Sequence, residues 1–404
     1  MHSGANDRVP TPSRTSDLHL LLGSSARELV AAVLGASPFP AAEVRSVRPM
    51  SVTVQPSGAA LVRYAVELGM PDATVVRETL VAATGSLLPR GAAVVEGDID
   101  ARQIAVGLWR WPNDPALPAL PRLLDPHRLR SLLASADVSG EHPPIVRVLS
   151  YRPTRRAVLE ITTGEQRLFA KVVTPSQLPG LRDRHDLLVQ CLPVPRLLIT
   201  TDDGLALMPA LPGSSARTAL RLRDPLPGPA MLEDVLDRLP AALTGLPRRS
   251  DHRRSAHHYG AVLAMTVPEE GHRVTTLADA IADADVGEHP IVPTHGDFYE
   301  HQLLTSGGQV TGLLDIDTAG PGHRLDDWAN LLAHLSVTGT PQARRWRSEI
   351  LWHVRDRFRM DDLCPRVAST LLGLATGPFR TQRAGWRERT RQRIDLAEHW
   401  LTSP

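Results

Sequence analysis

Several features that mark other classes of protein are scarce or absent in this 404-residue chain. It has two cysteines, Cys191 and Cys364, which lie too far apart for a disulfide framework or a metal-binding cysteine motif. No run of about 18 apolar residues occurs, so no transmembrane helix is expected. Residues 1–16 are polar and lack the apolar core of a signal peptide. The net charge of +1 points to neither nucleic acid nor a membrane surface, and we expect a cytoplasmic protein.

Lysine is almost absent as well. Lys171 is the only one, because 44 of the 45 basic residues are arginine. Lysine carries a compact ammonium on a flexible stem and arginine a wide planar fork, so a single remaining lysine suggests a site where arginine will not serve. Lys171 lies in an apolar run with strand character, residues 167–173. A point charge on a strand inside a cleft can hold nucleotide phosphates. The alternative is a chance survivor on a surface strand.

The first third of the chain predicts one helix followed by a β-rich unit. Leucines and alanines at helical spacing indicate a helix over residues 17–34. Short alternating segments over residues 44–111, punctuated by glycine and proline, indicate strands. A proline-rich passage at residues 111–126 is typical of a linker or an extended strap.

A second β section begins near residue 144. Three apolar segments joined by tight turns, the last one bearing Lys171, predict antiparallel strands. A short helix and a further apolar strand are expected at residues 181–190 and 205–211. Beyond Gly213 the pattern is mainly helical, except near residues 291–317.

That exception is the most informative stretch of the chain. A His-Gly-Asp triplet ending at Asp297 is followed by two apolar runs around a Gly-Gly turn, which predicts a hairpin. Such a hairpin places Asp297 and Gln302 at its entrance and returns Asp315 and Asp317 to the same end. Carboxylates gathered in a cleft repel one another, and a hard cation such as Mg²⁺ removes that repulsion.

The stretch resembles the aminoglycoside phosphotransferase / choline kinase superfamily. The signature of that superfamily is His-Gly-Asp, an amide five residues after the Asp, and a second Asp eighteen residues after it; Asp297, Gln302 and Asp315 reproduce both spacings. Residues 320–329 resemble the family's Gly-Pro-rich loop, and Lys171 falls where the family keeps its phosphate-binding lysine. The first 130 residues are similar in size and β-content to the extra cap of maltokinase-like sugar kinases.

The resemblance implies a role for each matched residue. Asp297 would be the catalytic residue that orients the acceptor hydroxyl for attack. Asp315 and Gln302 would hold Mg²⁺, with Asp317 either a second metal contact or a cap for the following loop. Lys171 would neutralise phosphate charge. The nucleotide, ATP or GTP, would also be bound by Arg155, in the turn between the first two strands of the second β section, and by an adenine-binding hinge at Met208, Ala210 and Leu211.

The chain departs from the family pattern at two places. Gln302 stands where the family usually has asparagine and is one methylene longer. The helix after Lys171 has no glutamate to pair with the lysine, and Asp183 or Asp186 is the nearest acidic candidate. A nucleotide-binding pseudokinase without turnover is therefore an alternative. Three residues outside the reacting groups are interpreted as structural: His295 and Asp327 as supports of the catalytic loop, and Trp328 as core.

The fold that the resemblance implies is an α+β, bilobal, protein-kinase-like fold. It has a β-rich N-lobe, a mainly helical C-lobe and an additional N-terminal cap subdomain. We expect a disordered tail at residues 1–16, the cap with its linker at 17–130, the N-lobe at 131–213 and the C-lobe at 214–404.

The function that the resemblance implies is ATP- and Mg²⁺-dependent phosphorylation of a hydroxyl group on a small molecule such as a sugar or amino sugar. An aminoglycoside kinase is the alternative. Residues 340–404 contain 13 arginines and seven acidic residues, and this excess argues against a polycationic acceptor. We expect no nucleic acid or membrane partner, and the sequence leaves the oligomeric state open.

Overall fold

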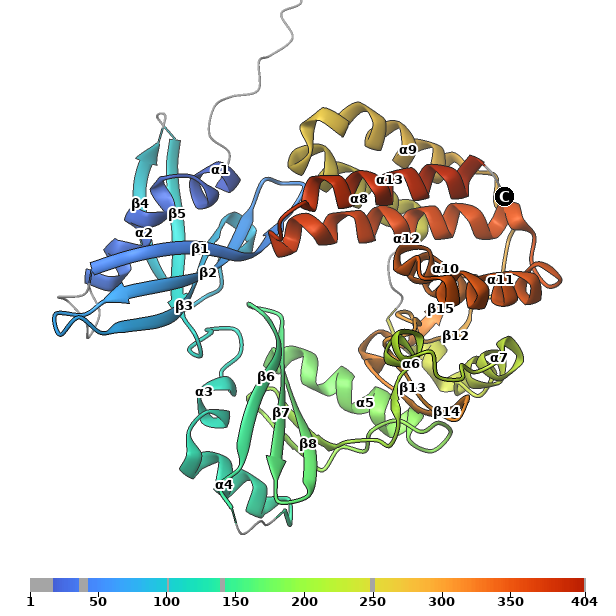
Figure 1. Ribbon diagram of the computed structural model, residues 1–404, viewed down its shortest axis with the longest axis horizontal. Coiled ribbons are helices and arrows are strands. Elements are labelled where there is room, and N and C mark those ends of the chain that lie inside the picture. Colours follow the sequence, from blue (N-terminus) through green and yellow to red (C-terminus); the bar gives the residue numbers. More distant parts are fainter. Residues whose placement is uncertain (1–16, 36–42, 100–101, 139–141, 248–250, 403–404) are drawn as a thin grey trace, which may run out of the picture. The chain divides into compact units, whose positions relative to one another are not determined.

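The computed structural model of the chain describes residues 17–35, 43–99, 102–138, 142–247 and 251–402 (Figure 1). It divides into two compact units, Met1–Trp111 and Pro112–Pro404. The tail expected at residues 1–16 lies outside the described residues. The finer division into lobes at residues 131–213 and 214–404 stays a prediction.

The first unit is a five-stranded antiparallel sheet preceded by two short helices, α1 (Asp17–Leu22) and α2 (Ser25–Gly35). Val62, Tyr64, Val66 and Leu68 are buried at alternate positions of one strand, as the period of two requires when one face covers a core. The β-rich character predicted for this segment is confirmed. In sheet order the strands are β1 (Glu43–Val54), β2 (Ala60–Gly69), β3 (Val75–Thr84), β5 (Arg102–Arg110) and β4 (Ala93–Ile99).

The single helix expected over residues 17–34 is wrong, because the chain leaves the helix between α1 and α2. The backbone N–H of Gly23 donates to the carbonyl oxygen of His19 at 2.8 Å and closes the last turn of α1. A Cβ atom at Gly23 would lie 2.6 Å from that same oxygen, so the position suits glycine alone. The hydroxyl of Tyr64 donates to the carbonyl oxygen of Leu21 at 2.5 Å and fixes α1 on the sheet.

The proline-rich passage forms an ordered strap on the second unit. Its anchor is Asp114, which is buried. The carboxylate of Asp114 accepts from the Tyr151 hydroxyl and from the Thr154 backbone N–H, both at 2.8 Å, and so holds the turn of the next hairpin. Two short helices follow, α3 (Leu120–Leu123) and α4 (Pro126–Ser135), the second capped by the side chain of Asp125.

A second five-stranded antiparallel sheet carries Lys171 on its central strand. Lys171 is paired with Val158 on one side and Ala206 on the other, so strands cover both edges of its own strand. The three predicted antiparallel strands and the predicted helix after them are confirmed. In sheet order the strands are β6 (Ile145–Arg152), β7 (Arg156–Thr163), β8 (Gln166–Val173), β10 (Leu205–Pro209) and β9 (Ile199–Thr201), and the helix is α5 (Leu178–Leu188).

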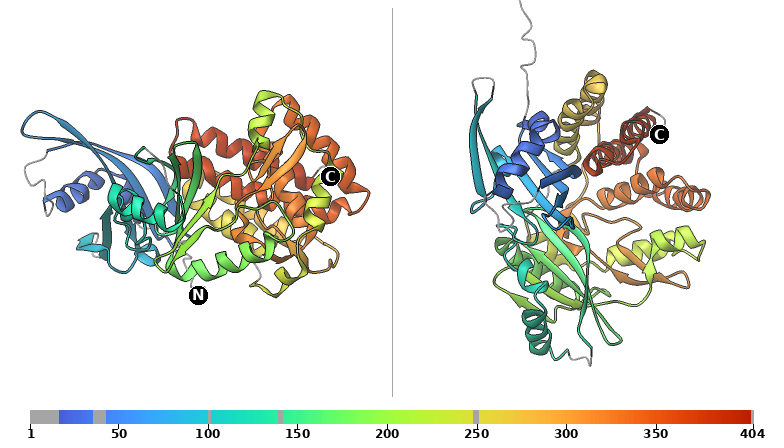
Figure 2. Two further views of the ribbon diagram at one scale, coloured as in Figure 1. Left: turned by 90° about the horizontal axis from the view of Figure 1, so that it is seen from below. Right: turned by 60° about the vertical axis from the view of Figure 1, so that its left-hand side comes forward.

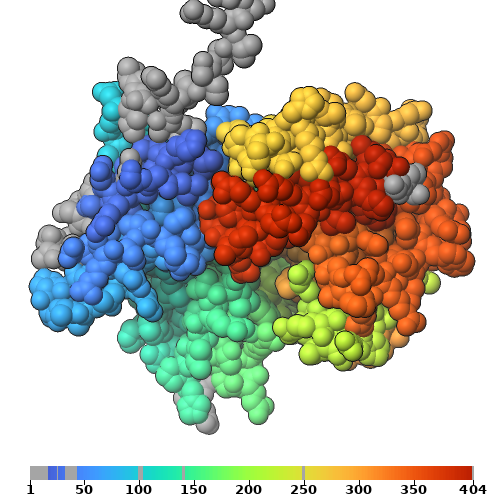
Figure 3. Space-filling view, turned by 45° about the horizontal axis from the view of Figure 1, so that its top comes forward, coloured from blue at the N-terminus to red at the C-terminus, as the bar shows by residue number. Residues whose placement is uncertain are grey.

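The rest of the second unit is mainly helical, as expected. Its core surrounds Trp328, which is fully buried and meets the ring of Phe298 edge-on at 6.4 Å, so the core role of Trp328 is confirmed. Figures 1 and 2 show four of the helices side by side, α8, α9, α12 and α13; Figure 3 shows α13 (red) beside the gold α8–α9 pair on the surface. The helices are α6 (Ala216–Leu222), α7 (Pro229–Asp237), α8 (His252–Thr266), α9 (Gly271–Asp283), α10 (Arg324–Thr338), α11 (Pro341–Arg355), α12 (Met360–Thr381) and α13 (Trp386–Thr402).

Short strands within this helical part hold the His-Gly-Asp stretch. The predicted hairpin is confirmed: β13 (Leu303–Ser306) and β14 (Gln309–Leu313) are joined by a turn in which Gly307 and Gly308 both have positive φ. β11 (Ser214–Ser215) extends the hairpin on its other side. A second pair, β12 (Val292–Thr294) and β15 (Gly320–Gly322), closes the loop around it. The segments before and after the hairpin are thereby brought together.

Within the part of the chain that the structure describes, no helix is long and apolar enough to cross a membrane.

The turn before β10 gives a first testable prediction, because Gly204 there supports the strand beside Lys171. Gly204 has φ +94°, and a Cβ atom there would lie 2.1 Å from the carbonyl oxygen of Val173. Gly204→Ala should lower the free energy of unfolding by about 1–2 kcal/mol for the left-handed backbone and by about 1–3 kcal/mol more for overpacking. The measurement is the midpoint temperature of thermal unfolding, which should fall. Gly164→Ala is the matched control, with φ +55° and nothing within 4 Å of its Cβ position. Equal losses in the two variants would contradict the prediction.

Candidate active site

The segments before and after the hairpin carry the acidic residues Asp297, Asp315 and Asp317. Asp297 follows β12 through the His295–Gly296 turn, and Asp315 and Asp317 follow β14. Asp315 has φ +51° and ψ +49°, a left-handed conformation that aspartate adopts more readily than most residues. This kink directs the chain into a short 3₁₀ turn, Ile316–Thr318, that carries Asp317. The expected convergence of carboxylates from separate segments is confirmed.

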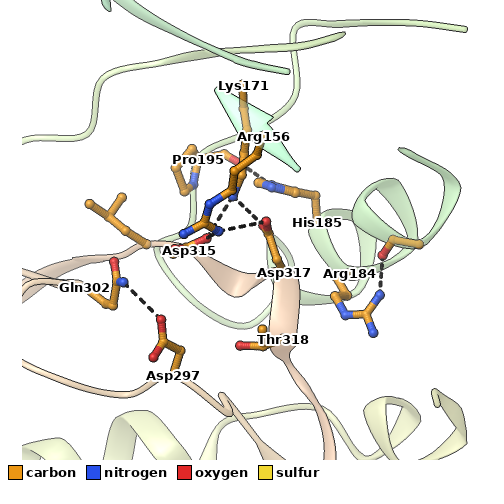
Figure 4. Close-up of polar contacts among 12 residues, drawn as sticks. Arg156, Lys171, Arg184, His185, Pro195, Asp297, Gln302, Asp315, Asp317 and Thr318 are labelled. Atoms are coloured by element: carbon orange, nitrogen blue, oxygen red, sulfur yellow. Dashed lines mark hydrogen bonds and ion pairs between the residues drawn. The ribbon is translucent and has the colours of Figure 1, made fainter. Parts of the chain in front are cut away.

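Two cations from the sheet meet these carboxylates (Figure 4). The ammonium of Lys171 lies 2.8 Å from Asp315 Oδ1 and 2.5 Å from Asp317 Oδ1. The guanidinium of Arg156 lies 3.0 Å from Asp315 Oδ1 and 3.5 Å from Asp317 Oδ2. The side chain of Lys171 is only 9% exposed, so the charges act across a partly dry space. Two positive and two negative groups form one balanced cluster.

Arg156 was missed by the sequence analysis, which selected its neighbour Arg155. Arg155 lies in the β6–β7 turn with its side chain exposed, and it forms no ion pair with Asp315 or Asp317. The alternation of side chains along a β-strand could have identified Arg156. Val158 is paired with Lys171, and Arg156, two residues earlier on β7, projects from the same face of the sheet, whereas Arg155 precedes the strand.

The partner expected for Lys171 on α5 is also corrected. Neither Asp183 nor Asp186 contacts the lysine, which pairs with Asp315 and Asp317 instead. The physical reason is the helical period: α5 buries Leu181, His185 and Leu188, and Asp183 and Asp186 fall on its exposed side. α5 instead contacts the segment after Asp317 through Arg184, whose Nε donates to the carbonyl oxygen of Ala319 at 2.8 Å.

The electrostatics of the cluster keep Asp315 ionised. Burial by itself would raise the pKa of Asp315, but the charges and hydrogen bonds of Lys171 and Arg156 outweigh burial and hold the pKa well below its ordinary value. Arg156 shows the reciprocal effect: burial would lower its pKa, and Asp315 and Asp317 raise it above the ordinary value. Asp315 and Arg156 are therefore both charged near neutral pH.

Asp297 is held by two side-chain amides. Gln302 donates from Nε2 to Asp297 Oδ2 at 3.4 Å, and Asn330 donates from Nδ2 to Asp297 Oδ1 at 3.3 Å. Asn330 also donates to the carbonyl oxygen of Phe298 at 3.3 Å. The sequence analysis did not single out Asn330. Its spacing of three residues after Asp327 places both on one face of α10, which would have been sufficient signal.

The loop that carries Asp297 rests on His295 and Asp327, so their interpretation as supports is confirmed. Asp327 is fully buried, and its two carboxylate oxygens accept from the backbone N–H groups of His295 and Gly296 at 3.0 and 2.8 Å. The His295 ring bridges two segments: Nε2 donates to the carbonyl oxygen of Leu314 at 2.9 Å, and Nδ1 accepts from the Asp297 backbone N–H at 3.2 Å. The position of Asp297 relative to Asp315 is fixed by this bridge.

The donor set of the site fits a magnesium ion. Mg²⁺ is usually bound by one or two carboxylates together with phosphate oxygens and water. Asp315 and Asp317 supply two carboxylates. The amide nitrogen of Gln302 is turned to Asp297, so its oxygen is directed away from that carboxylate. Among the described residues, no group of three or more His, Cys, Asp or Glu side chains is arranged to hold a metal ion.

The predicted hinge lies at the end of β10. Met208 is buried in a small apolar cluster with Leu178 and Leu181 of α5. The backbone N–H of Ala210 donates to the carbonyl oxygen of Arg167 at 2.9 Å and so extends the pairing with β8 beyond the strand. Leu211 is half-buried. The nucleotide-binding role of these three residues stays a prediction.

Comparison with known proteins gives one match that spans the site. The sequence model of the phosphotransferase enzyme family matches residues 154–363, just over half of the chain. This range contains the cluster of Lys171, Arg156, Asp315 and Asp317 together with Asp297. No curated protein sequence matches the chain at a significant level.

Solved structures that match the chain in shape have low sequence identity to it. One is APH(2″)-IIa in a ternary complex with streptomycin and ATP, with 12% identity, a TM-score of 0.47, and coverage of 69% of this chain and 98% of that one. Another is a choline/ethanolamine kinase family protein from Mesorhizobium loti, with 16% identity, a TM-score of 0.48, and coverage of 69% and 95%. A third is a macrolide 2′-phosphotransferase type I, with 17% identity, a TM-score of 0.44, and coverage of 70% and 98%.

The lowered pKa of Asp315 gives a pH prediction. A carboxyl whose folded-state pKa lies below its ordinary value of 3.8 contributes stability above that pH, and the contribution is lost as the pH falls through the lowered folded-state pKa. The difference in unfolding temperature between wild type and Asp315→Asn should therefore stay constant from about pH 7 to about pH 5 and shrink below about pH 4. Asp234→Asn, at an exposed ion pair with Arg238, is the control and should show little difference at any pH. A difference in unfolding temperature that already shrinks between pH 7 and pH 5 would contradict the lowered pKa of Asp315.

Proposed function

Starting from the premise that this chain belongs to the phosphotransferase enzyme family and is a small-molecule kinase, we propose that it transfers the γ-phosphoryl group of ATP or GTP to a hydroxyl group of a sugar, amino sugar or similar compound. The observation that carries the proposal is the convergence of Lys171 and Arg156 on Asp315 and Asp317, next to the separately anchored carboxylate of Asp297. Phosphoryl transfer requires mainly positioning and charge neutralisation, and this arrangement supplies both.

Asp297 is proposed as the catalytic residue. Gln302 and Asn330 donate to its two oxygens and fix its plane, which leaves the remaining lone pairs to accept a hydrogen bond from the acceptor hydroxyl. The hydroxyl oxygen then attacks the γ-phosphorus in line, the bond to the bridging oxygen of the nucleoside diphosphate breaks, and the hydroxyl proton passes to Asp297. The backbone support from Asp327 keeps the carboxylate in place during this step.

Lys171 and Arg156 are proposed to hold the nucleotide phosphates, with Met208, Ala210 and Leu211 beside the base and Arg155 at the entrance. In the structure the two cations neutralise Asp315 and Asp317. Asp315, Asp317 and Gln302 are the residues proposed to hold Mg²⁺, which when bound neutralises charge on the phosphates. A metal ion held by these carboxylates would leave Lys171 and Arg156 available to contact phosphate oxygens. Nucleotide binding thus exchanges one set of counter-ions for another without leaving a buried charge unpaired.

The first test is thermal stabilisation by ATP and by GTP, each with and without Mg²⁺. Wild type should show a Mg²⁺-dependent rise in unfolding temperature with at least one nucleotide. Asp315→Ala should lose that rise, because it removes a proposed metal ligand. Asp297→Ala should keep the rise and lose about 10²–10⁴-fold in the rate of nucleoside diphosphate release with an acceptor. A stabilisation indifferent to Mg²⁺ would instead favour a nucleotide-binding pseudokinase.

The only lysine of the chain gives a second test. The ammonium of Lys171 contacts two carboxylates from a nearly buried position, and Arg156 already occupies the adjacent space. A planar guanidinium cannot be placed there without displacing one of them, so Lys171→Arg should lower kcat/KM by roughly tenfold or more while conserving the charge. Arg167→Lys, at a half-exposed side chain on the same strand, is the matched control and should be near wild type. Normal activity of Lys171→Arg would contradict the role assigned to the lysine.

A further inference from the structure

One face of helix α10 follows the loop that carries Asp297. Asp327 accepts from two backbone N–H groups at the start of that loop, at 3.0 and 2.8 Å. Asn330, nearly one turn later, donates to Asp297 Oδ1 at 3.3 Å. His334, four residues further on, stacks on the ring of Tyr299 with centroids 3.8 Å apart. Spacings of three and four residues lie on one helix face, so Asp297 and Tyr299 contact helix positions about 6 Å apart along the axis.

The two oxygens of Asp297 have partners on different sides. Oδ2 accepts from Gln302 at 3.4 Å, and the carbonyl oxygen of Gln302 accepts from the backbone N–H of Leu314 at 2.8 Å, directly before Asp315. Oδ1 accepts from Asn330 on α10. Asp297 therefore lies between the segment that carries the proposed metal ligands and the face of α10.

Tyr299 and His334 carry hydrogen-bonding atoms that are free to meet a ligand. Both side chains are half-buried, and their ring planes are 24° apart. Within the described ranges, neither the Tyr299 hydroxyl nor a ring nitrogen of His334 has a hydrogen-bond partner in the protein, and none of these atoms is sealed from solvent. Because each ring covers one face of the other, the pair presents its polar edge. Convergent polar atoms in a partly desolvated position are typical of sites that a ligand completes.

The pair is uncharged near neutral pH. Burial lowers the pKa of His334 to about 3, so its imidazole is neutral, and burial raises the pKa of Tyr299 above its ordinary value, so its hydroxyl keeps the proton. The carboxylate that follows Tyr299 in the sequence, Glu300, is fully buried and pairs with Arg217 at 2.8 Å. With Asp297 occupied by the reacting hydroxyl, an ammonium group bound at the pair would meet no carboxylate from this loop. An uncharged ligand fits this environment better.

We propose that Tyr299 and His334 bind the phosphoryl acceptor, and that the acceptor is an uncharged compound with at least two hydroxyl groups, such as a sugar or a cyclic polyol. This inference rests on the function proposed above and names the substrate class of the same site. One hydroxyl lies at Asp297 and reacts, and a second one hydrogen-bonds to the polar edge of the pair. A phenol and a neutral imidazole each offer a donor and an acceptor, as a hydroxyl group requires.

The first experiment measures which acceptors the full-length protein uses. The neutral compounds are D-glucose, D-ribose and myo-inositol, and the cations are kanamycin and choline. Calorimetry measures binding of each compound without nucleotide, and nucleoside diphosphate release with Mg²⁺ and ATP or GTP measures turnover. At least one neutral compound should be bound and phosphorylated in preference to both cations. Among its monodeoxy analogues, at least one that keeps the reacting hydroxyl should lose roughly tenfold or more in kcat/KM, because the polar edge is then left unpaired.

Two variants test the residues themselves. Tyr299→Phe and His334→Phe remove the hydrogen-bonding atoms and keep an aromatic ring in the stack. Each should lower kcat/KM for the neutral acceptor by roughly tenfold, mainly through KM, and should keep the Mg²⁺-dependent thermal stabilisation by nucleotide. Discrimination against the deoxy analogue should shrink in both, because the partner of the missing hydroxyl has been removed. Tyr259→Phe is the matched control, since this half-buried tyrosine on α8 packs against Gly373 of α12, and it should resemble wild type.

Three outcomes would overturn the inference. One is preference for kanamycin or choline, or a failure to bind any of the neutral compounds. Another is that both variants behave like Tyr259→Phe. The third is an equal loss for the acceptor and its deoxy analogue, which is the result of a purely structural role. The Tyr299 hydroxyl has no partner among the described residues, so Tyr299→Phe stays informative if His334→Phe fails to fold.

Failure of the proposed function is recognised separately. Binding of a neutral acceptor that weakens in Tyr299→Phe and His334→Phe, without nucleoside diphosphate release, would uphold the acceptor subsite and exclude the kinase reaction. Turnover that is indifferent to both variants would uphold the kinase reaction and reject the subsite.

Discussion

The cluster of Lys171, Arg156, Asp315 and Asp317 is the interaction on which the rest of the site depends. Its cations come from two strands of a sheet, and its carboxylates come from the turn after a hairpin more than 140 residues later in the chain. Each charge is partly desolvated, so none would be stable there without the others. The cluster therefore specifies how the sheet meets the helical part. Under the proposed function, the same four residues exchange these partners for phosphate and a metal ion.

The carboxylate proposed as catalytic is organised by a different principle. Asp297 takes no part in the cluster and is held by neutral amides, whereas the loop beneath it rests on the buried carboxylate of Asp327. His295 connects the two systems by bonding the backbone on both sides of the hairpin. Separate anchoring allows the counter-ions of Asp315 to change while Asp297 stays in place, which an enzyme that binds and releases a nucleotide requires.

The sequence by itself determined the elements and the order of the acidic residues, because strand and hairpin patterns and the spacing of Asp297, Gln302 and Asp315 are local properties of the chain. The position of Lys171 on a strand was determined in the same way. Only the tertiary structure decided its partners: Arg156 rather than Arg155 enters the cluster, and the acids of α5 stay outside because the buried face of that helix excludes them. Contacts between distant segments depend on how elements pack, and local patterns carry little information about packing. For that reason the helix break at Gly23 emerged only from the folded chain.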